Sequence, residues 1–505
     1  MNLRSSISFL LAGSALFANA QFTSGLKPIP DSLKKGFDSI SPEDGRKNLS
    51  VLAGPGFEGR GTGQPGFEKA MDFMAMNFKK FGLKPIMPDG SYFQLVDFWK
   101  VGTDVSSLVL KTDRYTAKTN EIGVSLNGDL SVTGDAIFVV ANGKMTPTTP
   151  GQAVLTPEQE AQVKGKVVVF LNKSSRRRLE GAFVTAGASA VVNIVDKVSA
   201  PGWQGRRAKP DASTATARLA ITMDTAKKLF PTAGSIFGAT LPSEGVAITP
   251  LGTSITGAAK TMVDKARVGN VVAKLEGSDP ALKDEFIGVG AHLDHLGKNG
   301  DVWYPGADDD GSGTTALLML AKAFTSNPVK PKRTVIFMSF YGEEMGLLGS
   351  GYFANNPPID LTKMVAELQM DMVGRNSVGA QNGDQNRIDK EEENRDTIRL
   401  VGSKRISTAL DKIILAENES IGWKFKYDAE DVYTRSDHYN FARKGIPIAF
   451  FFTGFHPDYH QPTDTVDKIN FDKIANTAKL VYLTIHELGD YKGFLPHDVP
   501  PGKGQ

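Results

Sequence analysis

Three consecutive aspartates, Asp308 to Asp310, stand in the segment GADDDGSG, directly before the apolar segment TTALLMLAKAF. Like charges this close repel each other, so the segment is either a solvated loop or a site for a strongly positive partner. The chain contains no cysteine. A metal site in this protein would therefore use histidine, aspartate and glutamate, which suit zinc and its borderline neighbours.

Further histidines and carboxylates follow segments that have the apolar composition of buried strands. These are His292 with Asp294 after FIGVGA, Glu343 with Glu344 after TVIFMSFYG, Asp371 after MVAELQM, and His460 beyond IPIAFFFTG. In open α/β sheets, ligands bind beyond the carboxyl ends of the strands. We therefore expect these side chains to converge on one edge of one sheet, beside the acidic segment.

Such a set has the chemistry of a catalytic site for a pair of cations. One carboxylate bridges two metal ions roughly 3.5–4 Å apart, and each ion then has three protein ligands and room for water. Asp294 is placed to accept the second N–H of His292, as partners of metal-bound imidazoles do. Of Glu343 and Glu344, one binds metal and the other takes a proton from water; spacing alone does not decide which.

The elements that position these residues belong to an α/β domain. After about Gly269, apolar strands alternate with helices, which predicts a mixed, mostly parallel central sheet flanked by helices. Residues 111–254 instead contain short β-rich runs such as KGKVVVFLN and ASAVVNIV, separated by turn residues. We expect a discontinuous main domain of residues 21–110 and 255–495, a mostly β insert of residues 111–254, and a tail of residues 496–505.

The N-terminal segment MNLRSSISFLLAGSALFANAQ predicts export. It combines Arg4, an apolar run and the sequence Ala18-Asn19-Ala20, the pattern of a secretory signal peptide spanning residues 1–20. The protein is therefore expected to be periplasmic or secreted, and no later segment is apolar for long enough to anchor the mature chain in a membrane. A net charge of +2 gives no electrostatic case for nucleic acid as a partner.

The segments AHLDHLG, GADDDGSG, FYGEEMGLLGS, ELQMDMVG, TRSDHYNFARKGIP and DYHQPTDT, in this order, resemble zinc peptidase family M28. Members of that family include bacterial secreted aminopeptidases. The early segment GRGTGQPG also resembles the family's leading segment, and the β-rich insert is similar to a protease-associated domain. The resemblance implies the zinc-dependent exopeptidase fold and two zinc ions per chain.

The resemblance also implies a role for each matching residue. Asp308 bridges the zinc ions, His292 and Asp371 complete one site, Glu344 and His460 complete the other, Glu343 is the general acid/base, and Asp294 orients His292. It implies a cis peptide bond between Asp308 and Asp309, and it places Tyr433 and Ser436 near the substrate, where the tyrosine hydroxyl polarises the scissile carbonyl.

The remaining acidic residues and histidines are expected to have structural roles. Asp309 and Asp310 fit a supporting carboxylate and a helix start, and His295 fits a loop or supporting histidine rather than a sixth ligand. His438 fits local structure beside Asp437, and His456 lies on the approach to His460. His486 and His497 are expected to be incidental.

The leading hypothesis is an aminopeptidase that hydrolyses N-terminal peptide bonds of peptide substrates with two zinc ions and Glu343. A carboxypeptidase or dipeptidase on the same site is the alternative, and it needs a cation for the terminal carboxylate, for which Arg375, Arg435 and Lys444 are available. A non-catalytic receptor of the same fold is a further alternative. Glutaminyl cyclisation, usually with one metal, is disfavoured by the complete ligand set.

Overall fold

The computed structural model describes most of the chain in two compact units. The described residues are 27–125, 128–141, 155–171, 176–198, 204–206, 217–237, 246–299, 301–376, 391–427 and 432–499, so the predicted signal peptide lies outside them. The first unit comprises residues 1–95, 269–297 and 304–505, and the second comprises residues 96–268 and 298–303.

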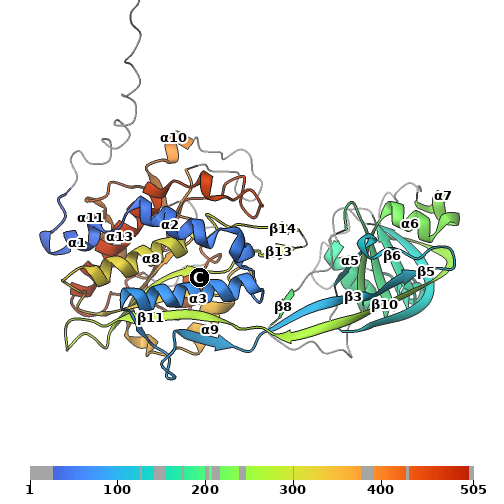
Figure 1. Ribbon diagram of the computed structural model, residues 1–505, viewed down its shortest axis with the longest axis horizontal. Coiled ribbons are helices and arrows are strands. Elements are labelled where there is room, and N and C mark those ends of the chain that lie inside the picture. The colour runs from blue at the N-terminus through green and yellow to red at the C-terminus, as the bar shows by residue number, and fades with distance from the viewer. Residues whose placement is uncertain are drawn as a thin grey trace, which may run out of the picture. The chain divides into compact units, whose positions relative to one another are not determined.

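The first unit is built on a nine-stranded sheet (Figure 1). Its order is β1 (Lys84–Pro85), β11 (Val268–Leu275), β15 (Thr334–Phe340), β12 (Phe286–His292), β16 (Met364–Met370), β19 (Ile448–Phe452), β17 (Thr397–Val401) and β18 (Lys424–Lys426), with β2 (Phe93–Val96) paired to β11. The central strands β15, β12, β16 and β19 run parallel to one another. At the two sides of this group, β11 pairs antiparallel with β15, and β17 pairs antiparallel with β19.

Helices cover both faces of this sheet, because its central strands carry apolar side chains on both sides. Phe337 of β15 contacts the rings of Phe78 in α3 (Pro65–Phe81) and Phe324 in α8 (Gly311–Ser326). The neighbouring residues Ile336 and Met338 point to the opposite face, as alternation along a strand requires, and there they form a core with residues of α9 (Leu348–Asn355) and α12 (His438–Ala442). The predicted α/β class with a mixed, helix-flanked sheet is confirmed.

The helix α8 lies at the centre of its layer. It packs against α1 (Asp31–Asp38), α2 (Pro42–Leu52), α3 and α13 (Phe471–Asp490), and its residues are almost all buried. Two further helices, α10 (Glu391–Asn394) and α11 (Thr408–Asn418), contact β17 and β19 respectively. The buried TTALLMLAKAF segment therefore anchors the residues that precede α8.

The second unit has its own eight-stranded sheet. Its order is β4 (Ile122–Ser125), β9 (Ala217–Thr222), β7 (Ala190–Val195), β6 (Val167–Leu171), β5 (Leu130–Ala141), β10 (Val246–Lys265), β3 (Trp99–Lys111) and β8 (Gln204–Arg206). Val168 and Phe170 of β6 face a core with α4 (Pro157–Val163) and α5 (Arg176–Thr185). Val167 and Val169 face a separate core with α6 (Met223–Leu229) and α7 (Gly234–Phe237).

The boundaries of the second unit differ from the predicted residues 111 and 254. The long strands β3 and β10 pair from Trp99↔Lys265 to Lys111↔Thr256, so both belong to this sheet along their full length. Continuous strand pairing therefore extends the insert at both ends. In the part of the chain that the structure describes, no helix combines the length and apolarity needed to cross a membrane.

Candidate metal centre

The parallel strands of the first unit deliver the predicted side chains to one edge of the sheet. His292 is the last residue of β12, Glu343 and Glu344 follow β15, and Asp371 follows β16. The loop after β19 leads to His460. Since β15, β12, β16 and β19 are parallel neighbours, their carboxyl ends meet at the same place.

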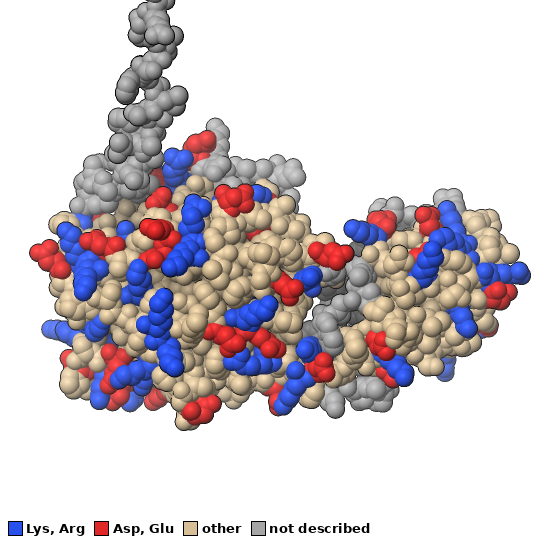
Figure 2. Space-filling view, viewed as in Figure 1, with Lys and Arg blue, Asp and Glu red and all other residues tan. Residues whose placement is uncertain are grey.

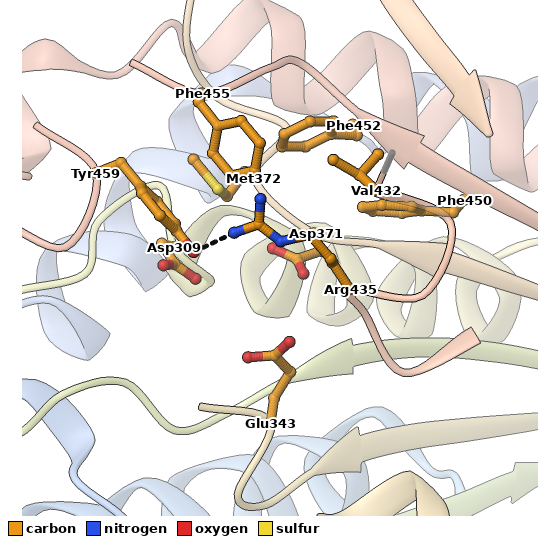
Figure 3. A pocket seen from close by; sticks show the side chains of 10 residues that line it. All are labelled: Asp309, Glu343, Asp371, Met372, Val432, Arg435, Phe450, Phe452, Phe455 and Tyr459. Carbon is orange, nitrogen blue, oxygen red and sulfur yellow. Dashed lines mark hydrogen bonds between the residues drawn. The ribbon is translucent and has the colours of Figure 1, made fainter. Parts of the chain in front are cut away.

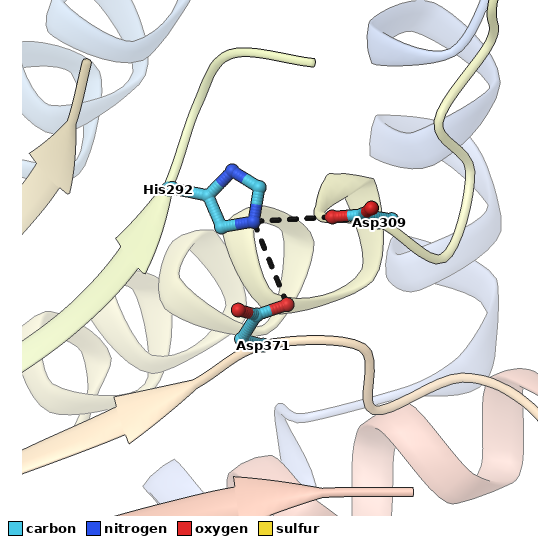
Figure 4. A group of neighbouring side chains, drawn as sticks. All are labelled: His292, Asp309 and Asp371. Carbon is cyan, nitrogen blue, oxygen red and sulfur yellow. Dashed lines mark ion pairs between the residues drawn. The ribbon is translucent and has the colours of Figure 1, made fainter. Parts of the chain in front are cut away.

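A first group joins one histidine and two carboxylates (Figure 4). The Nε2 atom of His292 lies 3.2 Å from Oδ1 of Asp309 and 3.5 Å from Oδ1 of Asp371. All three residues are buried. One imidazole nitrogen and two carboxylate oxygens thus point at one another from three separate segments of the chain.

A second group lies on the other oxygen of Asp309. Its Oδ2 atom is 3.1 Å from Nε2 of His460 and 3.6 Å from Nδ1 of His295. Glu344 completes the group, with Oε2 at 3.1 Å from Nε2 of His460 and Oε1 at 2.7 Å from Nδ1 of His295. The Asp309 carboxylate therefore faces one group with each of its oxygens, which is the arrangement of a bridging ligand.

The donor set fits zinc. Within the described residues, Nε2 of His292, Nδ1 of His295 and Oε1 of Glu344 are buried atoms without a hydrogen-bond partner, although other polar atoms lie close. Burial lowers the pKa of His460, but hydrogen bonds to Asp309 and Glu344 raise it to about 10. The negative charges of Asp309 and Glu344 therefore favour a positively charged group at this position. The imidazole nitrogen and carboxylate oxygen atoms of the two groups are ligands that suit Zn²⁺.

A family model described as Peptidase family M28 matches residues 270–485, a range that contains both groups. This segment of the chain is thus similar to peptidase family M28. A probable leucine aminopeptidase of Trichophyton verrucosum is 31% identical over 221 residues, covering 41% of this chain and 56% of that protein. The chain thus spans little more than half the length of this relative.

Two solved aminopeptidases share the fold. An aminopeptidase from Aneurinibacillus sp. strain AM-1 aligns with a TM-score of 0.56 at 21% identity, covering 92% of this chain and 97% of that chain. BSAP, a zinc aminopeptidase from Bacillus subtilis, aligns with a TM-score of 0.55 at 18% identity, covering 92% and 96%. At these identities the likeness concerns the fold, and it extends beyond the M28 segment.

Asp308 does not occupy the bridging position predicted for it. Its Oδ1 atom accepts the backbone N–H of Gly374 at 2.7 Å, and its Oδ2 atom lies 3.3 Å from Nε2 of His456. Its own backbone N–H donates to Asp464. Because adjacent side chains leave the backbone in different directions, only one of the three aspartates can face both groups, and in this M28 segment it is Asp309.

The cis peptide bond joins Asp309 and Asp310, not Asp308 and Asp309 as predicted. Asp310 caps α8 by accepting the N–H of Gly313, and it also accepts the backbone N–H groups of His292 and Met372. It thereby connects the start of α8 to the ends of β12 and β16. The predicted helix-start role fits Asp310, whereas the supporting role predicted for Asp309 is wrong.

His295 joins the second group, contrary to the expectation of a loop or supporting histidine. It is buried, and its imidazole ring lies 5.7 Å from that of His460 between centroids. The spacing in HLDH did not predict the place of His295 in this group, because the direction of its side chain depends on the backbone after β12. There Gly61 forms a β-bridge with His295, which fixes that direction.

Asp294 supports His292 through its main chain. Nδ1 of His292 lies 3.0 Å from the backbone oxygen of Asp294, and the carboxylate is farther away at 3.8 Å. The carboxylate instead accepts from the Thr62 hydroxyl and from the backbone N–H of Glu343. The predicted contact between the Asp294 carboxylate and His292 is thus replaced by a carbonyl contact, and the carboxylate positions Glu343.

Glu343 stands beside the first group without being part of it. Its Oε2 atom is 4.0 Å from Nε2 of His292. Burial raises the pKa of Glu343 well above its usual range; His292 opposes this, and the charges of Asp371 and Glu344 add to it. A carboxyl group with this proton affinity, close to a metal centre, is suited to proton transfer.

Arg60, in the GRGTGQPG segment, has a structural role that the sequence did not predict. This fully buried guanidinium donates to the carbonyl oxygens of Leu52, Leu293, Pro305 and Gly306. It therefore holds the segment after β12 and the loop before α8 together. The position of an arginine inside a glycine-rich loop could have indicated such a role, but the carbonyl partners Leu293, Pro305 and Gly306 lie far away in the sequence.

Tyr433 and Ser436, which were predicted to lie near the substrate, are not among the residues that line the pocket. The Ser436 hydroxyl is buried and donates to Oδ2 of Asp371 at 2.7 Å, so this residue positions a member of the first group. Tyr433 is buried in the apolar core, with the guanidinium carbon of Arg405 3.9 Å from its ring centroid. Their neighbours Val432 and Arg435 line the pocket instead.

Two other histidines have structural positions. His438 stacks on Phe450 at 4.6 Å between ring centroids and lies 2.7 Å from the Tyr433 carbonyl oxygen, and burial lowers its pKa to about 3. This agrees with its predicted local role. His456 lies between Asp308 and Arg375 and does not line the pocket.

A pocket opens beside the candidate metal centre (Figure 3). One end carries the carboxylates Asp309, Glu343 and Asp371, and the far wall is apolar. The apolar side chains are Met372, Val432, Phe450, Phe452 and Phe455, and Arg435 and Tyr459 stand between the two ends. A ligand with a charged group at one end and an apolar side chain fits this polarity.

Proposed function

We propose that this chain is a zinc-dependent aminopeptidase that binds two zinc ions and removes N-terminal residues from peptides. The observation that carries the proposal is the Asp309 carboxylate, which faces His292 and Asp371 with one oxygen and His295, Glu344 and His460 with the other. The names of the relative and of the solved aminopeptidases support the same activity.

The ligands of the two zinc ions would be His292, Asp309 and Asp371 for one, and Asp309, Glu344 and His460 with His295 beside them for the other. Bound zinc supplies Lewis acidity, which polarises a carbonyl group and makes water more acidic. Ser436 and Asp310 hold these ligands in place from behind.

Side chains that line the pocket transfer the proton and bind the substrate. Glu343 takes a proton from the attacking water and passes it to the leaving amine, since Asp309 and Asp371, the other carboxylates that line the pocket, are assigned to zinc. The N-terminal amine of a peptide would lie at the end of the pocket that carries the candidate zinc ligands Asp309 and Asp371. The apolar wall binds the first side chain, so we expect a preference for large apolar N-terminal residues.

A panel of blocked substrates tests this proposal. Aminoacyl amides and peptides with a free amine should be hydrolysed, and the same compounds acetylated at the amine should not. Dialysis against a chelator should abolish activity, and zinc should restore it. Hydrolysis of amine-blocked peptides from their free carboxyl end would show the opposite polarity and overturn the proposal.

Of the cations proposed for the carboxypeptidase alternative, Arg435 is the one among the described residues that line the pocket. Arg375 is buried with Asp458 and Asp464, and Lys444 bonds to Asn355 outside the pocket lining. Arg435 does line the pocket. The receptor alternative predicts that the chain binds no zinc, which elemental analysis tests directly.

We further propose that the chain is exported and that its signal peptide is cleaved after Ala20. The charged, apolar and small-residue pattern of residues 1–20 supports this. N-terminal sequencing of protein recovered from the periplasm or medium should begin at Gln21. Recovery of an uncleaved chain from the cytoplasm alone would contradict export.

A further inference from the structure

Arg435 stands where substrate chemistry would take place. It follows Val432 in a tight turn, with its backbone N–H donating to the Val432 carbonyl, and it directly precedes Ser436, which is bonded to Asp371. Its backbone is therefore fixed next to the first metal group. Its side chain is half-buried and lines the pocket rather than the protein surface.

Two aromatic residues hold the guanidinium at this position. Its carbon atom lies 4.5 Å from the ring centroid of Phe455, a cation–π distance. Its Nη2 atom donates to the Tyr459 hydroxyl at 3.4 Å. The Tyr459 ring in turn stacks on His460 at 3.8 Å between centroids. The guanidinium is thus preorganised in relation to both metal groups.

The pocket contains few groups that can stabilise negative charge. Asp309, Glu343 and Asp371 are acceptors when ionised, and the apolar wall offers no donor. Among the described residues that line the pocket, Arg435 is the cation and Tyr459 supplies the hydroxyl. Tyr433, which the family resemblance placed near the carbonyl, lies in the core under Arg405.

Arg435 and the proposed base face the pocket from different sides. In Figure 3, Glu343 reaches in from the segment after β15, and Arg435 with Tyr459 reaches in from the opposite side. A carbonyl group held between them would meet a proton acceptor on one side and a fixed cation on the other. Hydrolysis places negative charge on the carbonyl oxygen, which a preorganised donor stabilises.

We propose that the Arg435 side chain donates to the carbonyl oxygen of the scissile bond and stabilises the negative charge that develops there. This inference rests on the proposed peptidase function and adds a catalytic residue to it. A guanidinium stays protonated at all working pH values, so the positive charge at this position would not depend on pH. The contribution belongs to the transition state, and the loss of Arg435 should lower kcat more than it raises KM.

The test compares Arg435→Met and Arg435→Lys with Arg443→Met, a matched change of an exposed arginine outside the pocket lining. On the best aminoacyl amide of the wild type, Arg435→Met should lower kcat by about 10²-fold, with KM within about 3-fold. The kcat of Arg435→Lys should lie between the kcat values of Arg435→Met and the wild type, and the kcat of Arg443→Met should equal that of the wild type. Zinc content and thermal unfolding of each variant show whether it is folded.

Inhibitors separate a catalytic role from a structural one. An aminoalkyl phosphonate, which mimics the tetrahedral transition state, should lose affinity for Arg435→Met by the factor that kcat/KM loses. An amino alcohol, which has no carbonyl group, should bind both enzymes equally. Added guanidinium should raise kcat of Arg435→Ala and leave the wild type unchanged.

Different results would overturn the inference. A zinc-loaded, folded Arg435→Met enzyme with full activity excludes it while leaving the peptidase proposal standing. A loss confined to dipeptides with a free carboxylate, absent for dipeptide amides, would make Arg435 a carboxylate anchor and overturn it too. A wild type that hydrolyses none of these substrates overturns the proposed function itself, and the inference with it.

Discussion

At the scale of single residues, the three consecutive aspartates have three different tasks. Asp308 lies against His456 and the Gly374 amide, Asp309 faces both groups of candidate metal ligands, and Asp310 caps α8. Each carboxylate therefore has its own partners, and this explains how the repulsion among the charges is tolerated. The same distinction separates the neighbours Glu343 and Glu344, of which Glu344 contacts both histidines of the second group.

The assignment of Asp309 as the bridge predicts different effects for neighbouring substitutions. Asp309→Asn should bind less than one zinc ion per chain, because it weakens both groups. Asp308→Asn should keep its zinc and lose stability, since a buried acceptor for Gly374 is altered. Elemental analysis measures the zinc content of both variants, and thermal unfolding measures their stability. Normal zinc in Asp309→Asn together with loss in Asp308→Asn would restore Asp308 as the bridge.

The role of Glu343 predicts a variant that binds metal and is inactive. Glu343→Gln should retain zinc, because its Oε2 atom is no closer than 4.0 Å to His292, and kcat should fall by about 10³-fold without the base. Kinetics with elemental analysis measure both quantities. Glu276→Gln, at an exposed ion pair with Lys84, is the control and should be fully active. Full activity of Glu343→Gln would remove this residue from the mechanism.

At the scale of elements, the buried strands and helices set the position of the site. Strand β16 places Glu367 and Gln369 opposite Gly288 and Gly290 of β12. A side chain at Gly288 would collide with Met338, and one at Gly290 would collide with Gln369. Helix α8 is capped by Asp310 and packs against α13, where Phe324 contacts Tyr482 and His486. Rigid elements thus carry each ligand to the sheet edge.

The packing of α13 on α8 predicts a pH dependence of stability. Burial lowers the pKa of His486 to about 4, with Asp490 opposing this and Lys330 adding to it. The unfolded chain binds a proton near pH 6.5, so this contribution to stability is complete above that pH and is lost as the pH falls towards 4. Between about pH 7.5 and 5 the loss should be about 2 kcal/mol.

Unfolding in urea at both pH values measures this effect. His486→Phe, which keeps an aromatic ring against Phe324 and Tyr482, should lose less stability on acidification than the wild type by that amount. His497→Gln, at an exposed position near the C-terminus, should behave like the wild type. An equal acid sensitivity of His486→Phe and the wild type would assign the effect to other groups.

At the scale of the whole molecule, the metal groups join segments that are distant in the sequence. His292, Asp309, Glu344, Asp371 and His460 come from separate strands and loops of the first unit, whereas the second unit has cores of its own. On the visible face of each unit, basic and acidic side chains are interspersed (Figure 2). Metal binding should therefore stabilise one unit and not the other.

Metal removal tests this difference between the units. Zinc that binds only the folded first unit should stabilise it by about 4 kcal/mol at a concentration 1,000-fold above its Kd. Scanning calorimetry should show one transition that falls in temperature with chelator and one that does not, and hydrogen exchange should assign the sensitive transition to β12 and β16. A chelator shift in the second unit's amides would contradict this division.

The sequence carried most of the information about the fold. Continuous apolar runs such as TVIFMSF and MVAELQM identify strands buried on both faces, and residues that follow parallel strands must share an edge. The convergence of His292, Glu344 and Asp371 could thus be predicted. The boundaries of the insert could not, because they depend on how far β3 and β10 remain paired.

The sequence by itself indicated that histidines and carboxylates meet at the sheet edge, since residue type and the apolar pattern of each strand are local properties. Tertiary structure decided their roles: Asp309 rather than Asp308 between the groups, His295 within one of them, and Arg435 rather than Tyr433 in the pocket. The physical reason is direction. A side chain's orientation after a strand ends depends on backbone angles fixed by distant partners, such as Arg60 and Asp464, which no local pattern reveals.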